Sequence, residues 1–264
     1  MPMPESTGRN PAPTGGSISA FWIRSNLVTA AALRHERGVM SKAAATIDHP
    51  DMDLLARIGT KVRARLERDE SIFRFATETA EIFAVTNFFS AADCARLRGL
   101  VDATAEPSKL FDNPYESGFR TSYSGNLSRA DPFIRMIERR IDDLLGMPTE
   151  NAETVQGQRY MPGQEFKPHQ DYFHTNQPYW QDVRKRGGQR SWTAMAFLNQ
   201  VEDGGATEFP KLELSIPPQT GALLFWNNMN PDGSPNPATL HAGRPVIKGT
   251  KYIITKWYRA RKWG

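Results

Sequence analysis

Residues 191–201 read Ser-Trp-Thr-Ala-Met-Ala-Phe-Leu-Asn-Gln-Val, an uncharged run typical of a buried β-strand. Similar short runs recur through the second half of the chain, where Gly, Pro and Asn turns separate them. The strands predicted there are Thr154–Tyr160, Ser191–Val201, Thr207–Phe209, Glu213–Ile216, Ala222–Trp226, Thr239–Ala242 and Lys251–Arg259. Because no long helical pattern lies between them, we expect an antiparallel sandwich or a jelly-roll barrel whose open mouth holds a small ligand.

Helical patterns precede these strands. Apolar residues spaced three or four apart predict a helix over Asp51–Arg68. A capping-box pattern, Ser90-Ala-Ala-Asp93, predicts the start of a second helix. A third helix is expected to begin at Asp131-Pro132 and to end at Gly146. The fold class that follows is α+β and β-dominated, a double-stranded β-helix (jelly-roll) barrel with N-terminal supporting helices.

The chain divides into three parts by pattern. Residues 1–47 are rich in Pro, Gly, Ser and Ala and lack a sustained amphipathic period, which predicts a flexible N-terminal arm. Residues 48–150 are expected to form the helical support and the first strands. Residues 151–264 are expected to form the jelly-roll catalytic core.

Composition argues against several classes of protein. No stretch approaches the roughly 20 consecutive apolar residues that cross a bilayer, so we expect no membrane partner. The single cysteine, Cys94, argues against a disulfide-stapled fold and a zinc finger and favours a reducing, cytoplasmic location. The net charge is +4, but no tract of five basic residues accompanies it, so a basic nucleic-acid-binding module is a weak alternative. The sequence carries no signal for an oligomeric state.

The triplet His169-Gln-Asp171 is the first candidate for chemistry. Positions i and i+2 of an extended strand face the same side, so both side chains are expected to reach one cation. His241, on another predicted strand, is the candidate third ligand. Two imidazoles and one carboxylate leave about three positions of an octahedral ion open, as a dioxygen-activating iron requires. His174 lies on the opposite face of the strand and is excluded.

Lys251 is the second candidate. It shares one face of its predicted strand with Ile253, Thr255 and Trp257, so the ammonium is expected to enter an apolar pocket. An unpaired charge there costs several kcal/mol unless an anion meets it, and a dicarboxylic co-substrate would supply that anion. The alternative is that Lys251 points to solvent from an edge strand.

Several motifs follow one another in a specific order after residue 154. They are Arg159-Tyr-Met-Pro-Gly-Gln-Glu-Phe-Lys-Pro-His-Gln-Asp171, Thr193-Ala-Met-Ala-Phe-Leu-Asn199, Val201-Glu-Asp-Gly-Gly-Ala-Thr-Glu-Phe-Pro210, Gly221-Ala-Leu-Leu-Phe-Trp226 and Leu240-His-Ala-Gly-Arg-Pro-Val246, followed by Lys251. In this order they resemble the prolyl 4-hydroxylase family of 2-oxoglutarate- and iron(II)-dependent dioxygenases. Upstream, Phe119-Arg-Thr-Ser122 is similar to the family's Arg-Thr-Ser element.

The resemblance implies a role for each matching residue. His169, Asp171 and His241 would bind iron(II), and Lys251 would pair with the distal carboxylate of 2-oxoglutarate, which Tyr160 would help to hold. The implied reaction hydroxylates peptidyl proline and converts 2-oxoglutarate and O2 into succinate and CO2. Ascorbate is the implied reductant, and the implied partner is a protein or peptide that bears proline.

Weaker assignments follow from the same resemblance. Thr193 would add a hydrogen bond in the co-substrate site, although a threonine in a strand is often only a β-former. Arg120, Arg244 and Trp226 are candidate substrate residues, and Arg120 could instead brace the barrel against a helix through a carboxylate pair. Arg244 departs from the family pattern, in which a cysteine often stands at that position.

Other interpretations stay open. The polar, basic segment His174–Arg190 is expected to be either a lid over the barrel mouth or a solvated surface loop. The same mechanism could act on another amino-acid side chain or on a small molecule. A jelly-roll module that binds a metal without catalysis is a further alternative.

Overall fold

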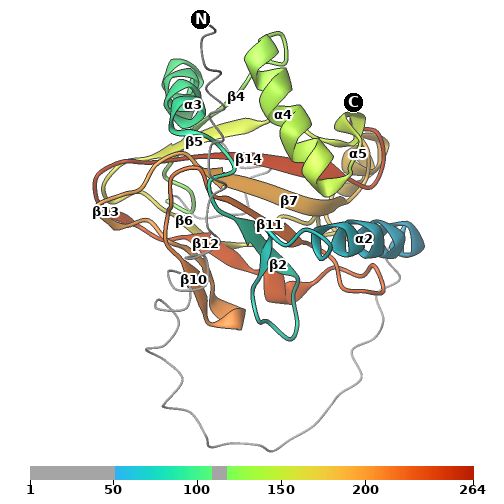
Figure 1. Ribbon diagram of the computed structural model, residues 1–264. Helices are drawn as coiled ribbons and strands as arrows, with labels where there is room; N and C mark the ends of the chain where they lie inside the picture. Colours follow the sequence, from blue (N-terminus) through green and yellow to red (C-terminus); the bar gives the residue numbers. More distant parts are fainter. Residues whose placement is uncertain (1–50, 109–117) are drawn as a thin grey trace, which may run out of the picture. The chain divides into compact units, whose positions relative to one another are not determined.

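Strands make up most of the regular structure in the computed structural model, which describes residues 51–108 and 118–264 (Figure 1). The helices are α2 (Met52–Leu66), α3 (Ala91–Thr104), α4 (Pro132–Leu145) and α5 (Trp180–Lys185). The strands are β1 (Phe73–Arg74), β2 (Ile82–Val85), β3 (Glu106–Pro107), β4 (Tyr123–Asn126), β5 (Gln156–Tyr160), β6 (Phe166–His169), β7 (Arg190–Phe197), β8 (Asp203–Gly204), β9 (Thr207–Phe209), β10 (Leu214–Ile216), β11 (Leu223–Asn227), β12 (His241–Gly243), β13 (Val246–Lys248) and β14 (Lys251–Arg259). The arm predicted over residues 1–47 lies outside the described residues.

Antiparallel pairing joins these strands into two larger sheets and one small one. The large sheet has the order β1-β2-β11-β7-β14-β5-β4-β3, and the second has the order β10-β9-β12-β6. A two-stranded sheet pairs β13 with β8. The prediction of a β-dominated jelly roll is confirmed. The described strands form two larger sheets, as a jelly roll requires.

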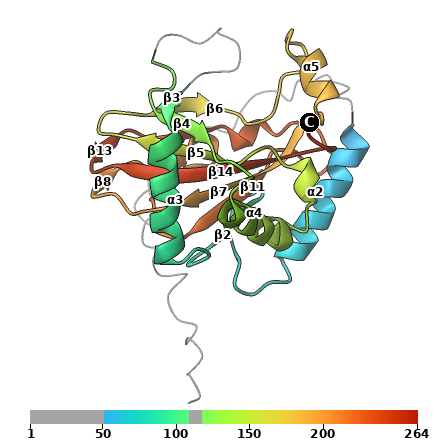
Figure 2. The ribbon, with the colours of Figure 1, turned by 90° about the horizontal axis from the view of Figure 1, so that it is seen from above.

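Helices α3 and α4 cover one face of the large sheet, as Figures 1 and 2 show. Leu97 of α3 and Ile141 of α4 are fully buried in a cluster that includes Ala194 of β7 and Ile254 of β14. Burying the apolar stripe of each helix on the sheet supplies most of the stability of such short helices. The supporting role predicted for the N-terminal helices is therefore confirmed.

The helix ends follow their sequence signals. The Ser90 hydroxyl accepts from the Asp93 amide at 3.1 Å, and the Asp93 carboxylate accepts from the Ser90 amide at 3.2 Å. The Asp131 carboxylate accepts from the Phe133 amide at 2.8 Å at the start of α4. Gly146 ends α4 with a φ of 66°, a left-handed conformation that glycine adopts without steric cost.

The N-terminal half also contributes strands to the large sheet. Strand β2 pairs with β11, and β4 pairs with β5. The boundary predicted at residue 150 therefore runs through a single sheet. None of the helices within residues 51–108 and 118–264 combines the length and apolar character that crossing a bilayer requires.

Two local expectations differ from the structure. The sequence analysis assumed an extended strand at His169–Asp171, whereas the strand there, β6, covers residues 166–169. Its bounds were not predicted, because Lys167 and Pro168 interrupt the apolar pattern. Strand β6 ends at His169, so Asp171 lies beyond the strand and not on its continuing face. The strand predicted over Thr239–Ala242 begins two residues later, after a short 3-10 turn at Pro237–Thr239.

Candidate active site

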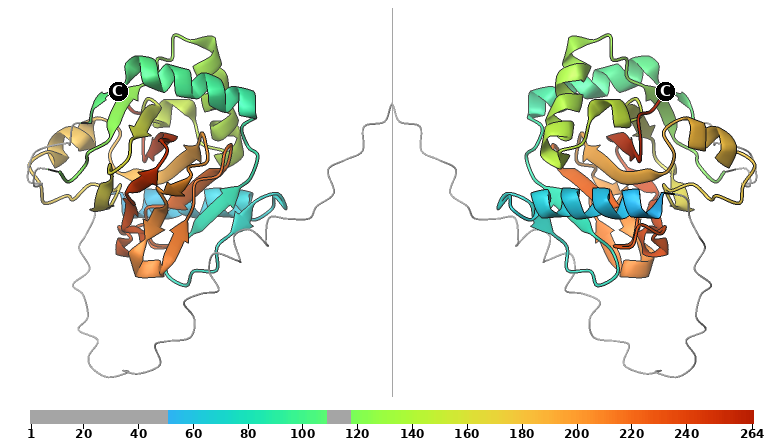
Figure 3. Two further views of the ribbon diagram at one scale, coloured as in Figure 1. Left: turned by 90° about the vertical axis from the view of Figure 1, so that its left-hand side faces the viewer. Right: turned by 90° about the vertical axis from the view of Figure 1, so that its right-hand side faces the viewer.

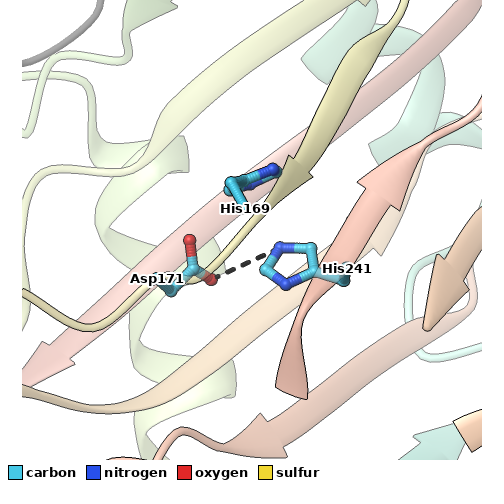
Figure 4. A group of neighbouring side chains, drawn as sticks. All are labelled: His169, Asp171 and His241. Carbon is cyan, nitrogen blue, oxygen red and sulfur yellow. Dashed lines mark ion pairs between the residues drawn. The ribbon is translucent and has the colours of Figure 1, made fainter. Parts of the chain in front are cut away.

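Three candidate ligands converge at the edge of the second sheet. His169 is the last residue of β6, His241 is the first residue of β12, and the two are paired across these neighbouring strands. Asp171 turns back from the loop after β6, so all three side chains point to one place (Figure 4). Their ligand atoms lie within 4.8 Å of one another, and His241 Nε2 is 3.8 Å from Asp171 Oδ2. The strand pairing, not the spacing of the triplet alone, brings the three together.

The main chain orients both imidazoles. His169 Nδ1 lies 2.8 Å from the carbonyl oxygen of Lys167, and His241 Nδ1 lies 2.9 Å from that of Thr239. A carbonyl accepts only, so Nδ1 of each ring is the donor, and Nε2 is the ring nitrogen that is left to bind a metal. Metal-binding histidines are commonly fixed in this way through the second ring nitrogen. The donor set therefore fits a divalent cation.

Aromatic rings hold the imidazoles in place. Phe166 stacks on His169 with ring centres 3.5 Å apart. Trp226 packs edge-on against His241 at 4.8 Å, and Phe209 lies 5.5 Å from the same ring. Rings packed on both imidazoles restrict their rotation, so the ligand atoms are preorganised.

The charge states of the site also suit a cation. Burial, reinforced by the nearby His241 ring, lowers the pKa of His169 to about 3. Burial acts to raise the pKa of Asp171, but the two imidazoles, Arg190 and the Thr193 hydroxyl together lower it below its ordinary value. His169 is thus neutral and Asp171 ionised, as metal coordination requires.

A cavity opens beside the three ligands and extends between the two sheets. Its walls include Tyr160, Met195 and Ile253 from the large sheet, and Thr207 and His241 from the second sheet. The complete lining is Arg120, Gln158, Tyr160, Phe166, His169, Asp171, Met195, Thr207, Trp226, His241, Gly243, Lys251, Ile253, Thr255 and Trp257. All four residues predicted to share one face of β14 line this cavity.

Lys251 brings a buried ammonium into the cavity. Its side chain is 1% exposed, and Nζ lies 3.4 Å from the Thr207 hydroxyl and 5.4 Å from the ring centre of Tyr160. Strand β14 lies between β7 and β5, so the edge-strand alternative is wrong. No carboxylate in the described part of the chain forms an ion pair with Lys251, and burial lowers its pKa to about 7. An anion in the cavity would restore the charge that burial disfavours.

Comparisons with known proteins identify this combination. Residues 155–259 match the family model described as 2OG-Fe(II) oxygenase superfamily. The probable prolyl 4-hydroxylase 8 of Arabidopsis thaliana is 36% identical over 206 residues, which cover 69% of this chain and 69% of that protein. The chain belongs to the prolyl 4-hydroxylase family of 2-oxoglutarate- and iron(II)-dependent oxygenases.

Solved structures agree with this assignment. A viral collagen prolyl hydroxylase from Paramecium Bursaria Chlorella virus-1, in a 2OG complex, has a TM-score of 0.53 at 25% identity, covering 67% of this chain and 94% of that one. A prolyl hydroxylase from Trichoplax adhaerens, in complex with a hypoxia inducible factor peptide fragment, has a TM-score of 0.52 at 16% identity, covering 80% and 92%. The second likeness concerns the fold alone. This oxygenase is thus a jelly-roll dioxygenase.

Of the less certain site residues of this oxygenase, some lie at the cavity and others do not. The Tyr160 hydroxyl lies in the cavity and donates to Gln158 Oε1 at 2.8 Å. Trp226 is 1% exposed and supports His241, so it is placed as a wall of the cavity. Arg244 lies at the surface, outside the lining of the cavity, in an ion pair with Glu208 at 3.1 Å, and its role as a substrate residue stays a prediction.

Arg120 lines the cavity of this oxygenase beside Phe166, whose ring centre is 4.8 Å from the guanidinium. Its Nε donates to the Ser122 hydroxyl at 3.1 Å, and its Nη2 donates to Gln156 Oε1 at 3.0 Å. Neither partner is a carboxylate or lies on a helix, so the structure does not contain the brace that we considered. Burial lowers the pKa of Arg120. A role in substrate binding stays a prediction.

Thr193 does not line the cavity of this oxygenase. Its hydroxyl donates to Asp171 Oδ2 at 2.7 Å and so has no proton left for a co-substrate carboxylate. The expectation that Thr193 binds the co-substrate is therefore wrong. The exposed His174 does not join the candidate ligands, in agreement with the sequence analysis.

Sequence reasoning missed one buried ion cluster beside the site. Arg190 bonds both oxygens of Glu153, at 2.6 and 2.8 Å, and its Nη1 donates to the Asp171 carbonyl at 3.4 Å. Its guanidinium also lies 4.1 Å from the ring centre of Trp257, a cavity wall. Arg259 shares Glu153 at 2.6 Å. No sequence signal links these residues, because the pairing depends on strands that are distant along the chain.

The predicted lid segment contains helix α5 and its own small core. Phe173, Trp180 and Val183 are buried together, and Tyr179 packs against them. The segment leaves the fold at Asp171 and returns at Arg190, the two residues joined by the carbonyl contact described above. It is therefore neither a bare surface loop nor simply unstructured, and a role as a lid stays a prediction.

Proposed function

We propose that this oxygenase hydroxylates the C4 carbon of a prolyl residue in a peptide or protein, with 2-oxoglutarate and O2 converted to succinate and CO2. The observation that carries the proposal is the joint placement of two imidazoles, one carboxylate and the buried Lys251 ammonium in one cavity. Relatives named as prolyl 4-hydroxylases at 36% identity support proline as the target.

The chain's own residues divide the work. His169, Asp171 and His241 would hold iron(II), which supplies the oxidation chemistry when bound. Three protein ligands leave about three coordination positions for co-substrate and oxygen. Lys251 would pair with the distal carboxylate of 2-oxoglutarate and so orient the other end toward the ligands, with Thr207 and Tyr160 beside it.

The walls of the cavity limit water around the ligands. Met195 and Ile253 are at most 5% exposed, and Trp226 and Tyr160 are buried beside them. In such an apolar enclosure the ion pair between Lys251 and a carboxylate is stronger than in water. The cavity therefore favours a co-substrate with a charge at its far end over one without.

A peptide substrate, O2 as oxidant and ascorbate as reductant are proposed on the same basis. The viral collagen prolyl hydroxylase is named for a protein substrate, which supports a peptide or protein over a free amino acid here. Arg120, at the cavity wall, is the proposed contact for substrate. The cytoplasmic location expected from the single cysteine stays a prediction.

The test measures succinate and peptide products together. Purified protein, iron(II), ascorbate and 2-oxoglutarate are combined with proline-rich peptides, and mass spectrometry seeks one added oxygen on proline. Wild type is expected to produce succinate and hydroxylated peptide in equal amounts, and His169→Ala is expected to produce neither. Matched peptides with alanine in place of each proline serve as the control.

The outcomes separate the alternatives. Equal hydroxylation of the alanine peptides, or oxygen on another side chain, would show that the target residue is not proline. Succinate release that no peptide stimulates would favour a small-molecule substrate. Iron binding without any succinate release would favour a non-catalytic metal-binding module, and turnover that survives His169→Ala would remove the ligand assignment.

A further inference from the structure

A buried polar chain lies behind the candidate metal carboxylate. Thr193 of β7 donates its hydroxyl proton to Asp171 Oδ2 at 2.7 Å. Asn228, directly after β11, donates from Nδ2 to the Thr193 hydroxyl oxygen at 2.9 Å. Both Thr193 and Asn228 are 0% exposed. The proposed chemistry uses neither residue.

The donor and the acceptor of each hydrogen bond between Asn228, Thr193 and Asp171 follow from the groups involved. An ionised carboxylate only accepts, so the single hydroxyl proton of Thr193 must point at Asp171. The Thr193 oxygen can then only accept, which requires Asn228 to present its amide nitrogen. The amide and the hydroxyl polarise one another toward the negative charge, so the bond at Asp171 is charge-assisted.

The Asn228 side chain is retained at a cost. Its Oδ1 is buried with no hydrogen-bond partner within the described residues. An unpaired buried acceptor destabilises the fold, and an apolar side chain of similar volume would avoid that cost. The main chain of Asn228 is held on both sides, by Ser191 at 2.8 Å and by Asn236 at 2.9 Å. The amide nitrogen is thus presented to Thr193 from a fixed backbone.

Asp171 is the candidate ligand that most needs such support. His169 and His241 lie on paired strands and are each fixed through Nδ1, whereas Asp171 lies beyond the end of β6. Within the part of the chain that the structure describes, the contact on its main chain is a long 3.4 Å bond from Arg190 to its carbonyl oxygen. The bond from Thr193 therefore restricts the rotation of the carboxylate, and it holds the oxygen that lies 3.8 Å from His241 Nε2.

We propose that Thr193 and Asn228 form a positioning pair that holds the Asp171 carboxylate in the orientation that binds the divalent cation. This inference rests on the proposed function, since it takes Asp171 as a metal ligand. Neither residue lines the cavity. Their effect acts through Asp171 and appears first in the affinity for metal, because a freely rotating carboxylate loses part of its binding energy to ordering.

The variants separate the hydroxyl from the bulk of the side chain. Thr193→Val keeps the shape and the β-branch but removes the donor, whereas Thr193→Ser keeps the donor. Asn228→Leu removes the amide at similar volume. Thr255→Val is the matched control, because Thr255 is also a buried strand threonine beside the cavity but bonds Gln158 at 3.0 Å and not Asp171.

The measurement is the affinity of the purified protein for Mn(II) and for anaerobic Fe(II), by calorimetry and without any substrate. Thr193→Val is expected to weaken binding about 10–100-fold, the usual effect of losing an outer partner of a metal ligand. Thr193→Ser and Thr255→Val are expected to stay within about threefold of wild type. Asn228→Leu is expected to lie between, and Thr193→Val with Asn228→Leu should bind no more weakly than Thr193→Val alone.

Three outcomes overturn the proposal: wild-type affinity in Thr193→Val, equal losses in Thr193→Val and Thr193→Ser, or additive losses in the double variant. Thermal melting of the metal-free variants checks that they fold. If Thr193→Val does not fold, the metal affinity of Asn228→Leu still tests the proposal. Asp171→Ala and His169→Ala are measured alongside. Unchanged metal affinity in both of these would refute the proposed metal site itself, whereas their loss with intact Thr193→Val refutes only the positioning pair.

Discussion

Lys251 shows how a single residue can be destabilising alone and useful with a ligand. Its ammonium is buried near Thr207 and two aromatic rings, and burial lowers its pKa to about 7. In the unfolded chain the same group keeps its ordinary value of 10.5. Between these two pH values the unfolded state binds more protons, so the stability of the ligand-free protein rises with pH across this window. Below about pH 7 the cost of burial is fully present.

Binding of 2-oxoglutarate should therefore depend on pH. The distal carboxylate requires the protonated ammonium, so above about pH 7 each binding event must also take up a proton. We expect the apparent affinity to be constant below this pH and to fall above it by at most about tenfold per pH unit. Calorimetry with Mn(II) in place of iron(II) measures the affinity across the range. With 2-oxobutyrate, which lacks the distal carboxylate, the same fall must be absent, and its presence would assign the effect to another group.

At the scale of the element, β14 carries two buried lysines on opposite faces. Lys251 faces the cavity without a carboxylate, whereas Lys256 faces α4 and forms ion pairs with Asp142 at 2.6 Å and Glu138 at 3.6 Å. Asp142 also accepts from the Tyr258 hydroxyl at 2.6 Å. One strand therefore connects the cavity to the supporting helix. Within the described residues, the ammonium of Lys251 is buried without an ion pair, whereas the ammonium of Lys256 is buried in ion pairs.

The same substitution at these two positions is expected to have opposite effects. Lys251→Met should raise the free energy of unfolding of the ligand-free protein by about 1–4 kcal/mol near neutral pH, because it removes an unpaired buried charge. Lys256→Met should lower it by about 3–5 kcal/mol, because it leaves the buried Asp142 carboxylate without its cation, whereas Glu138 keeps its ion pair with Arg129. Urea unfolding measures both. Destabilisation by Lys251→Met would show that the ammonium is already paired without 2-oxoglutarate.

At the scale of the whole molecule, the candidate ligands connect two strands that are far apart in sequence. β6 and β12 are neighbours in the second sheet, and strands of the large sheet contribute residues to the opposite wall of the cavity. Figure 3 shows the strands of the C-terminal half, orange to red, gathered together in two further views. A metal site formed by residues from both strands exists only in the folded state. Metal binding therefore adds to the stability of the entire jelly roll.

Metal removal should accordingly lower the melting temperature. At a free metal concentration about 100 times the dissociation constant, one-site binding adds about 2.7 kcal/mol to the free energy of unfolding. Differential scanning calorimetry with Mn(II), with and without a chelator, is expected to show this loss in wild type. His241→Ala should melt at the same temperature in both conditions, and an equal shift in that variant would mean that the metal binds elsewhere.

Much of the fold and one wall of the cavity could be predicted from the sequence, because the sequence patterns that determine them are local. Ser90 with Asp93, and Asp131 with Gly146, set helix ends through bonds within a few residues, and the structure places the helices there. The alternation after Lys251 predicted one face of β14, and all four residues of that face line the cavity. These patterns reflect bonds and packing that the neighbouring sequence already dictates.

Other features depend on strand pairing, which single positions do not encode. Strand β6 is irregular in sequence and gains its structure from pairing with β12, and Asp171 leaves the strand that the spacing predicted. The proton of Thr193 goes to Asp171 and not to the co-substrate, because β7 passes behind the carboxylate. Arg190 and Glu153 meet because the Glu153 amide donates to the Trp257 carbonyl of β14, and β14 pairs with β7, which begins at Arg190.

The sequence by itself determined helices α2, α3 and α4, most strands of the second half, the residue types of the metal site and the lysine of the cavity. Only the tertiary structure decided which oxygen of Asp171 is held, which residues hold it, and that Arg244 stays at the surface. The physical reason is the range of the interactions. Periodicity and capping act between near neighbours, whereas a buried hydrogen bond or ion pair depends on which distant strands the sheet brings together.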